Sequence, residues 1–350
     1  MMMTIGGDSH KRTHTFVVVD ELGRQVDEKT VRATSDGHLD AIGWAAQWPE
    51  RRWALEDCRQ VTRRLEQDLV RSGESVVRVP TKLMADMRRG AREPGKSDPI
   101  DASAVARAAL REPDLPVARL DGPEREMRLL VDHREDLVGE RTRMQSRLRW
   151  HMHELIPEHV VQLRSLDRFH VLDDLERRFV AIGGPVADIA AELTTRIREL
   201  TIRINELYRE ITSIVTSLAP SLLALEGCGA LSAAKIVAET AGADRFRSRA
   251  AYARWNGTAP IPVWTANPRF RLSRGGNRQV NAAIHRIAIT QWRGQGAGHD
   301  YIKGRIERGD TKRSAIRALK RRISDEVFRR LNTYLAHRQP APLEDASLRP

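Results

Sequence analysis

Strand-like and helical segments succeed one another in a fixed order through the first ninety or so residues. The β-branched, strand-like runs end at Asp8 and then occupy residues 13–20, 25–33, 52–55 and 75–79. The segments with helical spacing occupy residues 35–47, 61–72 and 82–92. Three strands joined by short turns therefore precede an alternation of strands and helices. This order predicts a mixed α/β sheet covered by helices.

Four acidic residues lie where such a sheet would expose them. Asp8 ends the first strand and Glu56 follows the fourth. Asp98 and Asp101 open a predicted helix at residues 98–111. Carboxylates collected at strand ends and helix starts are the ligands that magnesium ions need to act on a phosphodiester. The pattern therefore favours metal-dependent nuclease chemistry on nucleic acid.

These acids also have structural interpretations. Asp98 can cap its helix, with the following proline at the first helical position and Asp101 at the third, which is close to a capping box. For this motif taken alone, capping is the simpler interpretation. Asp57 competes with Glu56, which we prefer because it follows the strand directly. The histidines, His10 among them, form no convincing ligand set in the sequence and are interpreted as structural or surface residues.

Basic residues are concentrated in the last third of the chain. The net charge is +12, but residues 245–338 alone hold 22 Lys and Arg against 5 Asp and Glu, a local balance of +17. The rest of the chain is therefore slightly acidic. A strongly basic segment beside a nearly neutral one predicts a polyanionic partner.

Two long stretches between these regions have apolar residues at helical spacing, at residues 124–154 and 187–218. Rich in Arg and Glu, they predict an antiparallel coiled-coil arm, with an ordinary helical bundle as the alternative. Residues 179–185 provide a break before the second helix. Further on, Gly227 and Gly229 form a Gly-x-Gly turn before a helix, as in helix-hairpin-helix modules that present backbone N–H groups to a DNA phosphate.

In order and spacing, the motifs of this chain resemble those of the DEDD-type bacterial insertion-sequence transposases, the insertion sequence one-ten family. The resemblance covers roughly residues 4–335. The motifs that carry it are G-x-D-x-H-K-x-T-H-T at 6–15, A-L-E-D-C-R at 54–59, V-V-R-V-P at 76–80, G-K-S-D-P-I-D-A at 95–102, the Gly227/Gly229 turn, G-T-A-P-I-P-V at 257–263 and R-L-S-R-G-G-N-R at 271–278.

The resemblance implies a fold and a domain order. Residues 1–118 would form a ribonuclease-H-like (RuvC-like) α/β domain, and residues 119–218 the helical coiled-coil arm. Residues 219–338 would form a mainly α transposase domain, followed by a disordered tail at 339–350. Asp8, Glu56, Asp98 and Asp101 would then be the Mg²⁺-binding tetrad of the first domain.

The resemblance also implies a nucleophile and a mechanism. Family members usually carry a nucleophilic serine in the loop after the A-P-I-P stretch, whereas this chain has Thr265, with Ser273 as a second choice. Threonine also carries a hydroxyl that can attack phosphorus. A covalent protein–DNA link would form and strands would be exchanged. Assembly as a dimer or tetramer and guidance by an element-encoded bridge RNA are implied as well.

Nucleic acid would be contacted by two further sets of residues. The first follows the A-P-I-P stretch and comprises Arg269, Arg271, Arg274, Asn277 and Arg278. The second lies on a basic helix and comprises Lys312, Arg313, Lys320, Arg321 and Arg322. The competing interpretation of the first set is an exposed basic loop, which the local charge of +17 makes the weaker one, and the second set could line a groove for RNA or DNA.

Three classes of function fit these observations. The first is a transposase or recombinase, the second a junction-resolving nuclease that uses the tetrad and water alone, and the third an inactive DNA- or RNA-binding remnant. No apolar run approaches the length of a membrane span, and the two cysteines have no metal-binding spacing. We therefore expect no membrane partner and a location in the bacterial cytoplasm with the nucleoid.

Overall fold

The computed structural model describes residues 1–56, 61–89, 97–112, 115–120, 122–159, 161–162, 165–262, 270–272 and 276–336. Contacts within the chain divide it into two units, which are described separately. Unit 1 comprises Met1–Gly122, Ala243–Trp255 and Ser273–Gly275. Unit 2 comprises Pro123–Gly242, Asn256–Leu272 and Gly276–Pro350.

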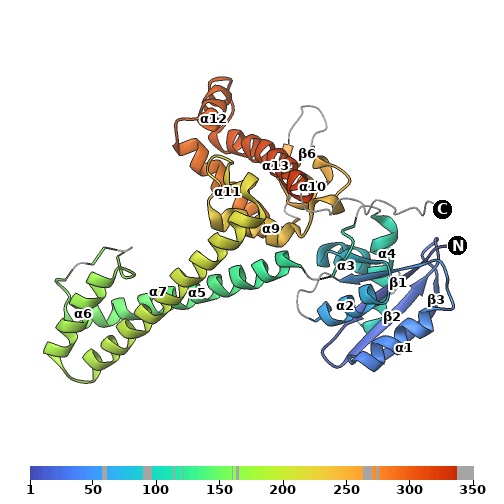
Figure 1. The fold of residues 1–350 in the computed structure, drawn as a ribbon, viewed down its shortest axis with the longest axis horizontal. Helices are drawn as coiled ribbons and strands as arrows, with labels where there is room; N and C mark the ends of the chain where they lie inside the picture. The colour runs from blue at the N-terminus through green and yellow to red at the C-terminus, as the bar shows by residue number, and fades with distance from the viewer. Residues whose placement is uncertain are drawn as a thin grey trace, which may run out of the picture. The chain divides into compact units, whose positions relative to one another are not determined.

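Unit 1 is built on a five-stranded sheet with the order β3-β2-β1-β4-β5 (Figure 1). The strands are β1 (Met3–Ser9), β2 (Thr13–Val19), β3 (Gln25–Arg32), β4 (Arg51–Glu56) and β5 (Val76–Val79). The first three pair antiparallel as a meander, and β4 pairs parallel with both β1 and β5. This order and these directions are those of a ribonuclease-H-like sheet, so the fold predicted for the N-terminal region is confirmed.

Helices cover both faces of this sheet. They are α1 (Ser35–Ala45), α2 (Arg63–Arg71), α3 (Thr81–Arg89) and α4 (Asp98–Arg111). One face packs Phe16, Trp53 and Leu55 against buried residues of α1 and α2. The other face packs Ala54 and neighbouring strand residues against α3 and α4. Unit 1 also includes the short helices η1 (Ala243–Arg245) and α10 (Arg249–Trp255).

Gly6 explains how closely α4 approaches the sheet. A Cβ added there would lie 2.1 Å from the carbonyl oxygen of Ala102 and 2.6 Å from the backbone nitrogen of Ala106. Only glycine fits such an approach, and the alanines of α4 keep the helix side equally thin. The first glycine of the G-x-D motif is therefore a packing residue that sets the height of α4 above β1.

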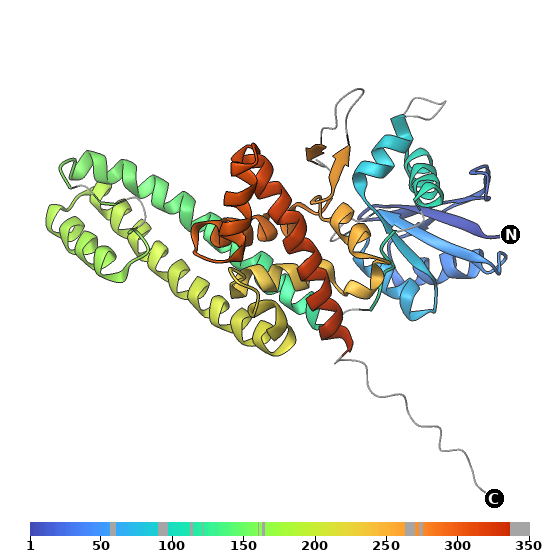
Figure 2. The same cartoon turned by 90° about the horizontal axis from the view of Figure 1, so that it is seen from above.

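Unit 2 begins with the predicted arm. It consists of α5 (Pro123–Leu155) and α7 (Pro185–Leu218), which run side by side (Figures 1 and 2). Arg196 pairs with Glu140 in the middle of α5, whereas Tyr208, later in α7, lies against Arg134, earlier in α5, so the helices are antiparallel. The buried residues of α7 repeat at heptad spacing and include Leu193, Ile197, Leu200, Ile204, Leu207 and Ile211. The coiled-coil arm is thus confirmed.

The far end of the arm differs from the prediction. A helix that the sequence analysis did not identify, α6 (Phe169–Ile182), packs Leu172, Leu175 and Phe179 against both long helices. Gly183 and Gly184 have positive φ angles, 68° and 88°, and end α6 before α7 starts. Ile189, which the sequence pattern placed on the apolar face, is 43% exposed, because Ala187 and Ala190 occupy that face instead.

The remainder of unit 2 is mainly helical. Its elements are α8 (Pro220–Leu223), α9 (Ala230–Thr240), β6 (Pro260–Pro262), β7 (Phe270–Leu272), α11 (Arg278–Arg293), α12 (Ala297–Glu307) and α13 (Lys312–Ala336). The tail predicted at residues 339–350 lies outside the described residues. Among the described helices, none combines the length and apolar character required to cross a membrane.

Candidate functional site

Side-chain alternation along β1 and β4 places two acids on the face covered by α4. A Cβ at Gly7 would contact Leu55 and Phe16 on the opposite face, whereas one at Gly6 would strike α4. Since side chains two residues apart in a strand share a face, Asp8 faces the same way as Gly6. By the same rule Glu56 shares its face with Ala54, which packs in the cluster beneath α4.

The same two acids lie at one edge of the sheet. Strands β1 and β4 are parallel neighbours, and Gly7 is paired with Leu55 in their register. Asp8 and Glu56 follow these residues, so the carboxyl ends of adjacent strands bring them to the same place. Asp8 is 8% exposed, and Glu56 is half-buried.

The start of α4 supplies the other two acids. Ser97, not Asp98, is the N-cap, and its hydroxyl accepts a hydrogen bond from the backbone N–H of Ile100. The capping interpretation of Asp98 is therefore wrong, because the serine one residue earlier takes that role. Asp98 is the first helical residue with a half-exposed side chain, and Asp101 is 7% exposed one turn later.

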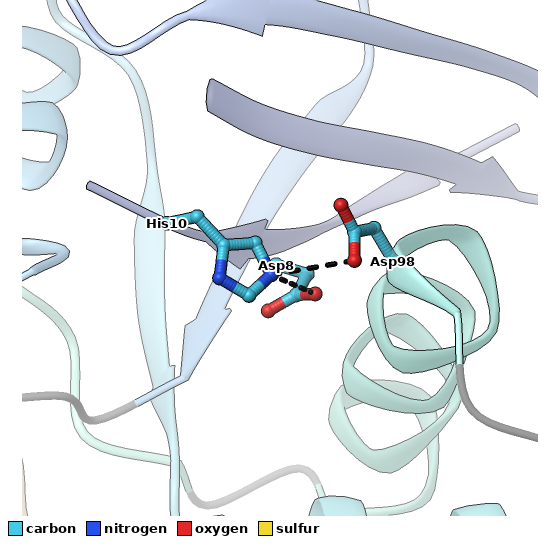
Figure 3. Close-up of side chains that lie close together, drawn as sticks. All are labelled: Asp8, His10 and Asp98. Carbon is cyan, nitrogen blue, oxygen red and sulfur yellow. Dashed lines mark hydrogen bonds and ion pairs between the residues drawn. The ribbon is translucent and has the colours of Figure 1, made fainter. Parts of the chain in front are cut away.

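Asp8 and Asp98 meet at a histidine (Figure 3). The Nε2 atom of His10 lies 3.1 Å from Oδ2 of Asp8 and 3.4 Å from Oδ1 of Asp98. One ligand atom from each of the three residues lies within 4.8 Å of the others. Asp101 is held differently, by a 3.0 Å ion pair with Arg88 of α3.

The sequence analysis placed His10 among structural or surface residues, and the structure adds that its half-exposed side chain contacts two of the acids. His10 follows Asp8 by two positions, just beyond the end of β1, and two-residue spacing along an extended chain directs side chains to one face. That spacing was the available signal. It was missed because a ligand set was sought among the histidines alone, and their spacing from the acidic residues was not compared.

Burial and like charge act on Asp8. Burial raises the pKa of its carboxyl above the usual range, His10 lowers it, and the nearby Asp101 and Asp98 carboxylates raise it further. Desolvation and neighbouring negative charge both disfavour the ionised form. A cation placed among these groups would relieve both effects. Carboxylate oxygens from a strand end and a helix start are also the donor set that hard divalent cations prefer, so the residues fit such an ion.

Several predicted contact residues fall outside the described part of the chain. These are Thr265, Ser273, Arg269 and Arg274. Arg271 lies in β7, where it is paired with Ile261 of β6 in an antiparallel hairpin. The structure thus describes the base of the loop that carries Thr265, and not the hydroxyl itself.

The Gly-x-Gly turn leads into a helix as predicted. Gly227 has a φ of 77°, which favours glycine, and a Cβ there would lie 3.1 Å from the carbonyl oxygen of Ile287 in α11. Gly229 is the N-cap residue of α9. The first glycine therefore has a packing role against α11 that the motif alone did not reveal.

Asn277 and Arg278 open α11. The side chain of Asn277 accepts a hydrogen bond from the backbone N–H of Val280 at 3.0 Å and donates one to Glu239 at 2.7 Å. Its amide thus caps the helix. Arg278 is exposed in the first turn.

The five residues of α13 that were predicted to contact nucleic acid fall into two groups in the structure. Arg321 pairs with Asp325, and the Arg322 guanidinium lies 4.2 Å from the centroid of the Tyr301 ring. The other three line a cavity of about 560 Å³ together with residues that the sequence analysis did not select. The full lining is His285, Lys312, Arg313, Ile316, Arg317 and Lys320.

Two family models match the chain. Residues 5–157 match the transposase model of DEDD proteins of the IS110 type. Residues 219–303 match a model described as transposase of the IS116/IS110/IS902 family. The first match includes all four acids of the sheet edge, and the second includes the Gly-x-Gly turn, the β6–β7 hairpin and α11.

Individual relatives give narrower matches. The insertion element IS116 uncharacterized 44.8 kDa protein of Streptomyces clavuligerus is 32% identical over 146 residues, which are 41% of this chain and 37% of that protein. The chain thus matches little more than a third of that relative's length. Among solved structures, Thermus thermophilus RuvC with a Holliday junction substrate is 13% identical, with a TM-score of 0.27 over 34% of this chain and all of that chain. A second structure of Thermus thermophilus RuvC is also 13% identical, with a TM-score of 0.27 over 33% of this chain and all of that chain.

Proposed function

This chain belongs to the IS116/IS110/IS902 family of transposases, and on that premise we propose that it cuts and rejoins DNA strands at the ends of an insertion sequence. One observation carries the proposal. Asp8 and Glu56 end neighbouring parallel strands, and Asp98 and Asp101 open the helix packed on the same face of the sheet. Four carboxylates from three elements are thereby directed to one edge.

We propose that these carboxylates hold divalent metal, with Mg²⁺ as the physiological ion. Asp8 and Asp98 offer oxygens close to one another, and Asp101 is oriented by Arg88. Glu56 would complete the set from the adjacent strand. When bound, Mg²⁺ would stabilise the negative charge that develops on the phosphate during attack. In this proposal the phosphodiester would lie at this edge of the sheet, next to the oxygens of Asp8 and Asp98.

The nucleophile of this proposal is the Thr265 hydroxyl, with Ser273 second. Its Oγ forms a bond to phosphorus, the bond from phosphorus to one deoxyribose oxygen breaks, and that oxygen takes up a proton. The result is a phosphodiester between protein and DNA, which a deoxyribose hydroxyl of another strand can reverse. Threonine differs from serine by a methyl group that restricts χ1, so the hydroxyl has fewer orientations available.

Partners follow from the family and from the charge distribution. We propose that DNA is bound at the element ends and at the target, that an element-encoded RNA pairs with both, and that a dimer or tetramer brings the metal site of one subunit to the hydroxyl of another. The +17 balance of residues 245–338 supports binding of such polyanions. Sequence reading by RNA pairing would leave the protein to contact backbone phosphates, as in other RNA-guided systems.

The test is junction PCR for excised element circles in cells that carry the whole element. We expect circles with the wild type and none with Thr265→Ala or Asp101→Asn. Thr265→Ser should retain or increase the yield, because it keeps the hydroxyl and frees χ1. Asp40→Asn, an exposed carboxylate of α1 that pairs with Lys29, is the matched control and should leave the yield unchanged.

The alternatives give different outcomes in the same experiment. A junction nuclease that uses water would be indifferent to Thr265→Ala and would form no covalent protein–DNA adduct. An inactive remnant would bind DNA with or without Asp101 and would give no circles under any condition. Equal yields from wild type and Thr265→Ala would remove Thr265 as the nucleophile.

A further inference from the structure

A cationic groove lies between α11 and α13 in unit 2. It is lined by His285 of α11 and by Lys312, Arg313, Ile316, Arg317 and Lys320 of α13, and it encloses about 560 Å³. None of the described lining residues is acidic. The spacing explains the arrangement, because residues four apart on a helix share a face: Lys312 with Ile316 and Lys320, and Arg313 with Arg317.

The groove has little negative charge available nearby. The sequence contains no Asp or Glu between residues 278 and 293, the length of α11, or between 312 and 324 in α13. In the described part of the chain, no carboxylate lies within ion-pair distance of Lys312, Arg313 or Arg317. Later in α13, in contrast, Arg329 and Arg330 both pair with Glu326. Cations of one helix are therefore paired with a carboxylate outside the groove, whereas within it the partner of Lys312 is the Trp292 ring, whose centroid lies 3.7 Å from Nζ.

Lys320 lies at the base of this groove and is 6% exposed. Its Nζ donates a 2.6 Å hydrogen bond to Oδ1 of Asn281, and no carboxylate of the described residues pairs with it. Burial, together with the smaller effect of the neighbouring Arg317, lowers the pKa of Lys320 to about 8. Burying an ammonium group beside an amide is unfavourable unless an anion completes its environment.

A buried polar network fixes the position of this ammonium group. Asn281 donates through Nδ2 to the backbone oxygen of Asn256 at 2.8 Å. Asn256 in turn donates to the hydroxyl of Ser324 at 2.8 Å and accepts from the Thr258 hydroxyl at 2.7 Å. Asn256 and Ser324 are fully buried. The lysine is therefore held in place before any ligand arrives, which reduces the entropy lost on binding.

We propose that the α11–α13 groove binds a phosphate group of a nucleic-acid backbone. The proposal rests on the proposed function and assigns part of its nucleic-acid contact to a defined site. Cations without a carboxylate partner among the described residues, gathered around a buried lysine, match a compact anion such as a phosphate group. Ile316 supplies an apolar wall against which a sugar can pack. The proposal adds His285, Ile316 and Arg317 to the contact residues suggested by the sequence. It does not include Arg321 and Arg322, which contact Asp325 and Tyr301.

The proposal is tested by fluorescence anisotropy with full-length protein, labelled DNA and RNA oligonucleotides, and a chelator to remove divalent metal. Binding is measured over a series of salt concentrations. The double variant Lys312→Gln/Arg317→Gln should lower the slope of log K against log[salt] by about 1 and weaken binding about tenfold at low salt. Arg329→Gln lies on the same helix outside the groove, pairs with Glu326, and should leave the slope unchanged.

A second variant and a second ligand keep the test decisive. Lys320→Met keeps the length of the side chain without its charge and should weaken oligonucleotide binding without loss of secondary structure by circular dichroism. Inorganic phosphate at millimolar concentration should compete with oligonucleotide for wild type and not for the double variant. Competition by inorganic phosphate that persists in the double variant, together with unchanged oligonucleotide slopes, would overturn the proposal, since the anion would then act at another site.

The outcomes also separate this proposal from the proposed function. Normal salt slopes in the double variant, with wild-type circle formation intact, would overturn the groove alone. Failure of the wild type to bind any DNA or RNA would overturn the proposed function as well.

Discussion

The acidic edge of unit 1 and the cationic groove of unit 2 gather like charges in different ways. At the sheet edge each contacted acid has a basic neighbour, His10 for Asp8 and Asp98, and Arg88 for Asp101. In the groove, among the described residues, Lys320 has only an amide partner. The first site carries its own basic neighbours, whereas the second lacks acidic ones.

This difference indicates how each site should respond to its ligand. At the sheet edge the acids already contact His10 and Arg88, so metal binding would replace existing contacts. The described residues of the groove include no acidic side chain that an anion would have to displace, so a bound anion would add contacts without breaking an ion pair. We expect bound metal to exchange contacts within unit 1, and bound phosphate to add contacts in unit 2 and to change its salt dependence.

Among the changes that test this comparison, substitution of Asp98 should have the largest effect, which is on metal affinity. Asp98→Asn keeps the shape of the half-exposed side chain and removes one anionic ligand. We expect the affinity for Mg²⁺ to fall about 10²-fold, as for other disruptions of metal-site residues. Isothermal titration calorimetry measures it, with Asp40→Asn as the control. Unchanged affinity in Asp98→Asn would separate Asp98 from the metal site.

Displacement of α4 tests whether the acids depend on its close approach to β1. Gly6→Ala places a methyl group 2.1 Å from the Ala102 carbonyl oxygen, so the helix must move. We expect a loss of about 1–3 kcal/mol in the free energy of unfolding and weaker metal binding. Gly43→Ala in α1 meets nothing within 4 Å and should stabilise by up to about 1 kcal/mol. Chemical denaturation compares the two. Equal stability would mean that α4 is not fixed by this contact.

Removal of His10 should sharpen the contrast between the two sites by changing which metal is preferred. Imidazole nitrogen suits Ni²⁺, whereas Mg²⁺ prefers oxygen ligands. His10→Ala should therefore weaken Ni²⁺ binding about tenfold and leave Mg²⁺ binding nearly unchanged. Competition titrations with both ions on the same protein give the ratio. An equal change for both ions would assign His10 a positioning role and not a ligand role.

Asp8→Asn should have the smallest effect and the opposite sign on stability. Because the folded protein raises the pKa of Asp8, its ionised form destabilises the metal-free fold at neutral pH, and this cost disappears as pH falls through the raised value. Asp8→Asn should raise the unfolding temperature at pH 7 in chelator by about 2–4 °C, the shift for about 1 kcal/mol. The gain should shrink in acid, and Mg²⁺ should no longer stabilise. Calorimetry at two pH values measures both unfolding temperatures. An Asp8→Asn variant less stable than the wild type at pH 7 in chelator would contradict the prediction.

The sheet could be predicted from the sequence because its strands are short, β-branched and separated by clear turns. Periodicity also identified the two arm helices, since their apolar residues repeat over many turns. Helix α6 was missed because residues 179–185 were interpreted as a break, whereas α6 continues to Ile182. Ile189 was placed on the wrong face because alanines, which carry little hydrophobic signal, occupy the buried positions Ala187 and Ala190.

The acids were accessible from sequence because strand ends and helix starts fix where a side chain can lie. Their neighbours were not, since the contacts of His10 and Arg88 depend on how α3 and α4 pack on the sheet. The groove was partly accessible, since the basic residues of α13 stand out in the sequence. Which of them are neutralised depends on partners such as Asp325 and Tyr301, and only the fold supplies these.

The most direct test of the central claim is Mg²⁺-dependent cleavage of element-end DNA, assayed with the matching RNA present, by wild type, Asp98→Asn and Glu56→Gln. Glu56 is the acid placed by strand register alone, with Asp57 as its competitor. The account predicts cleavage by wild type in Mg²⁺, none in chelator, and a loss of about 10²–10³-fold in both variants. Cleavage by Glu56→Gln at the wild-type rate would contradict a four-carboxylate site at this edge of the sheet.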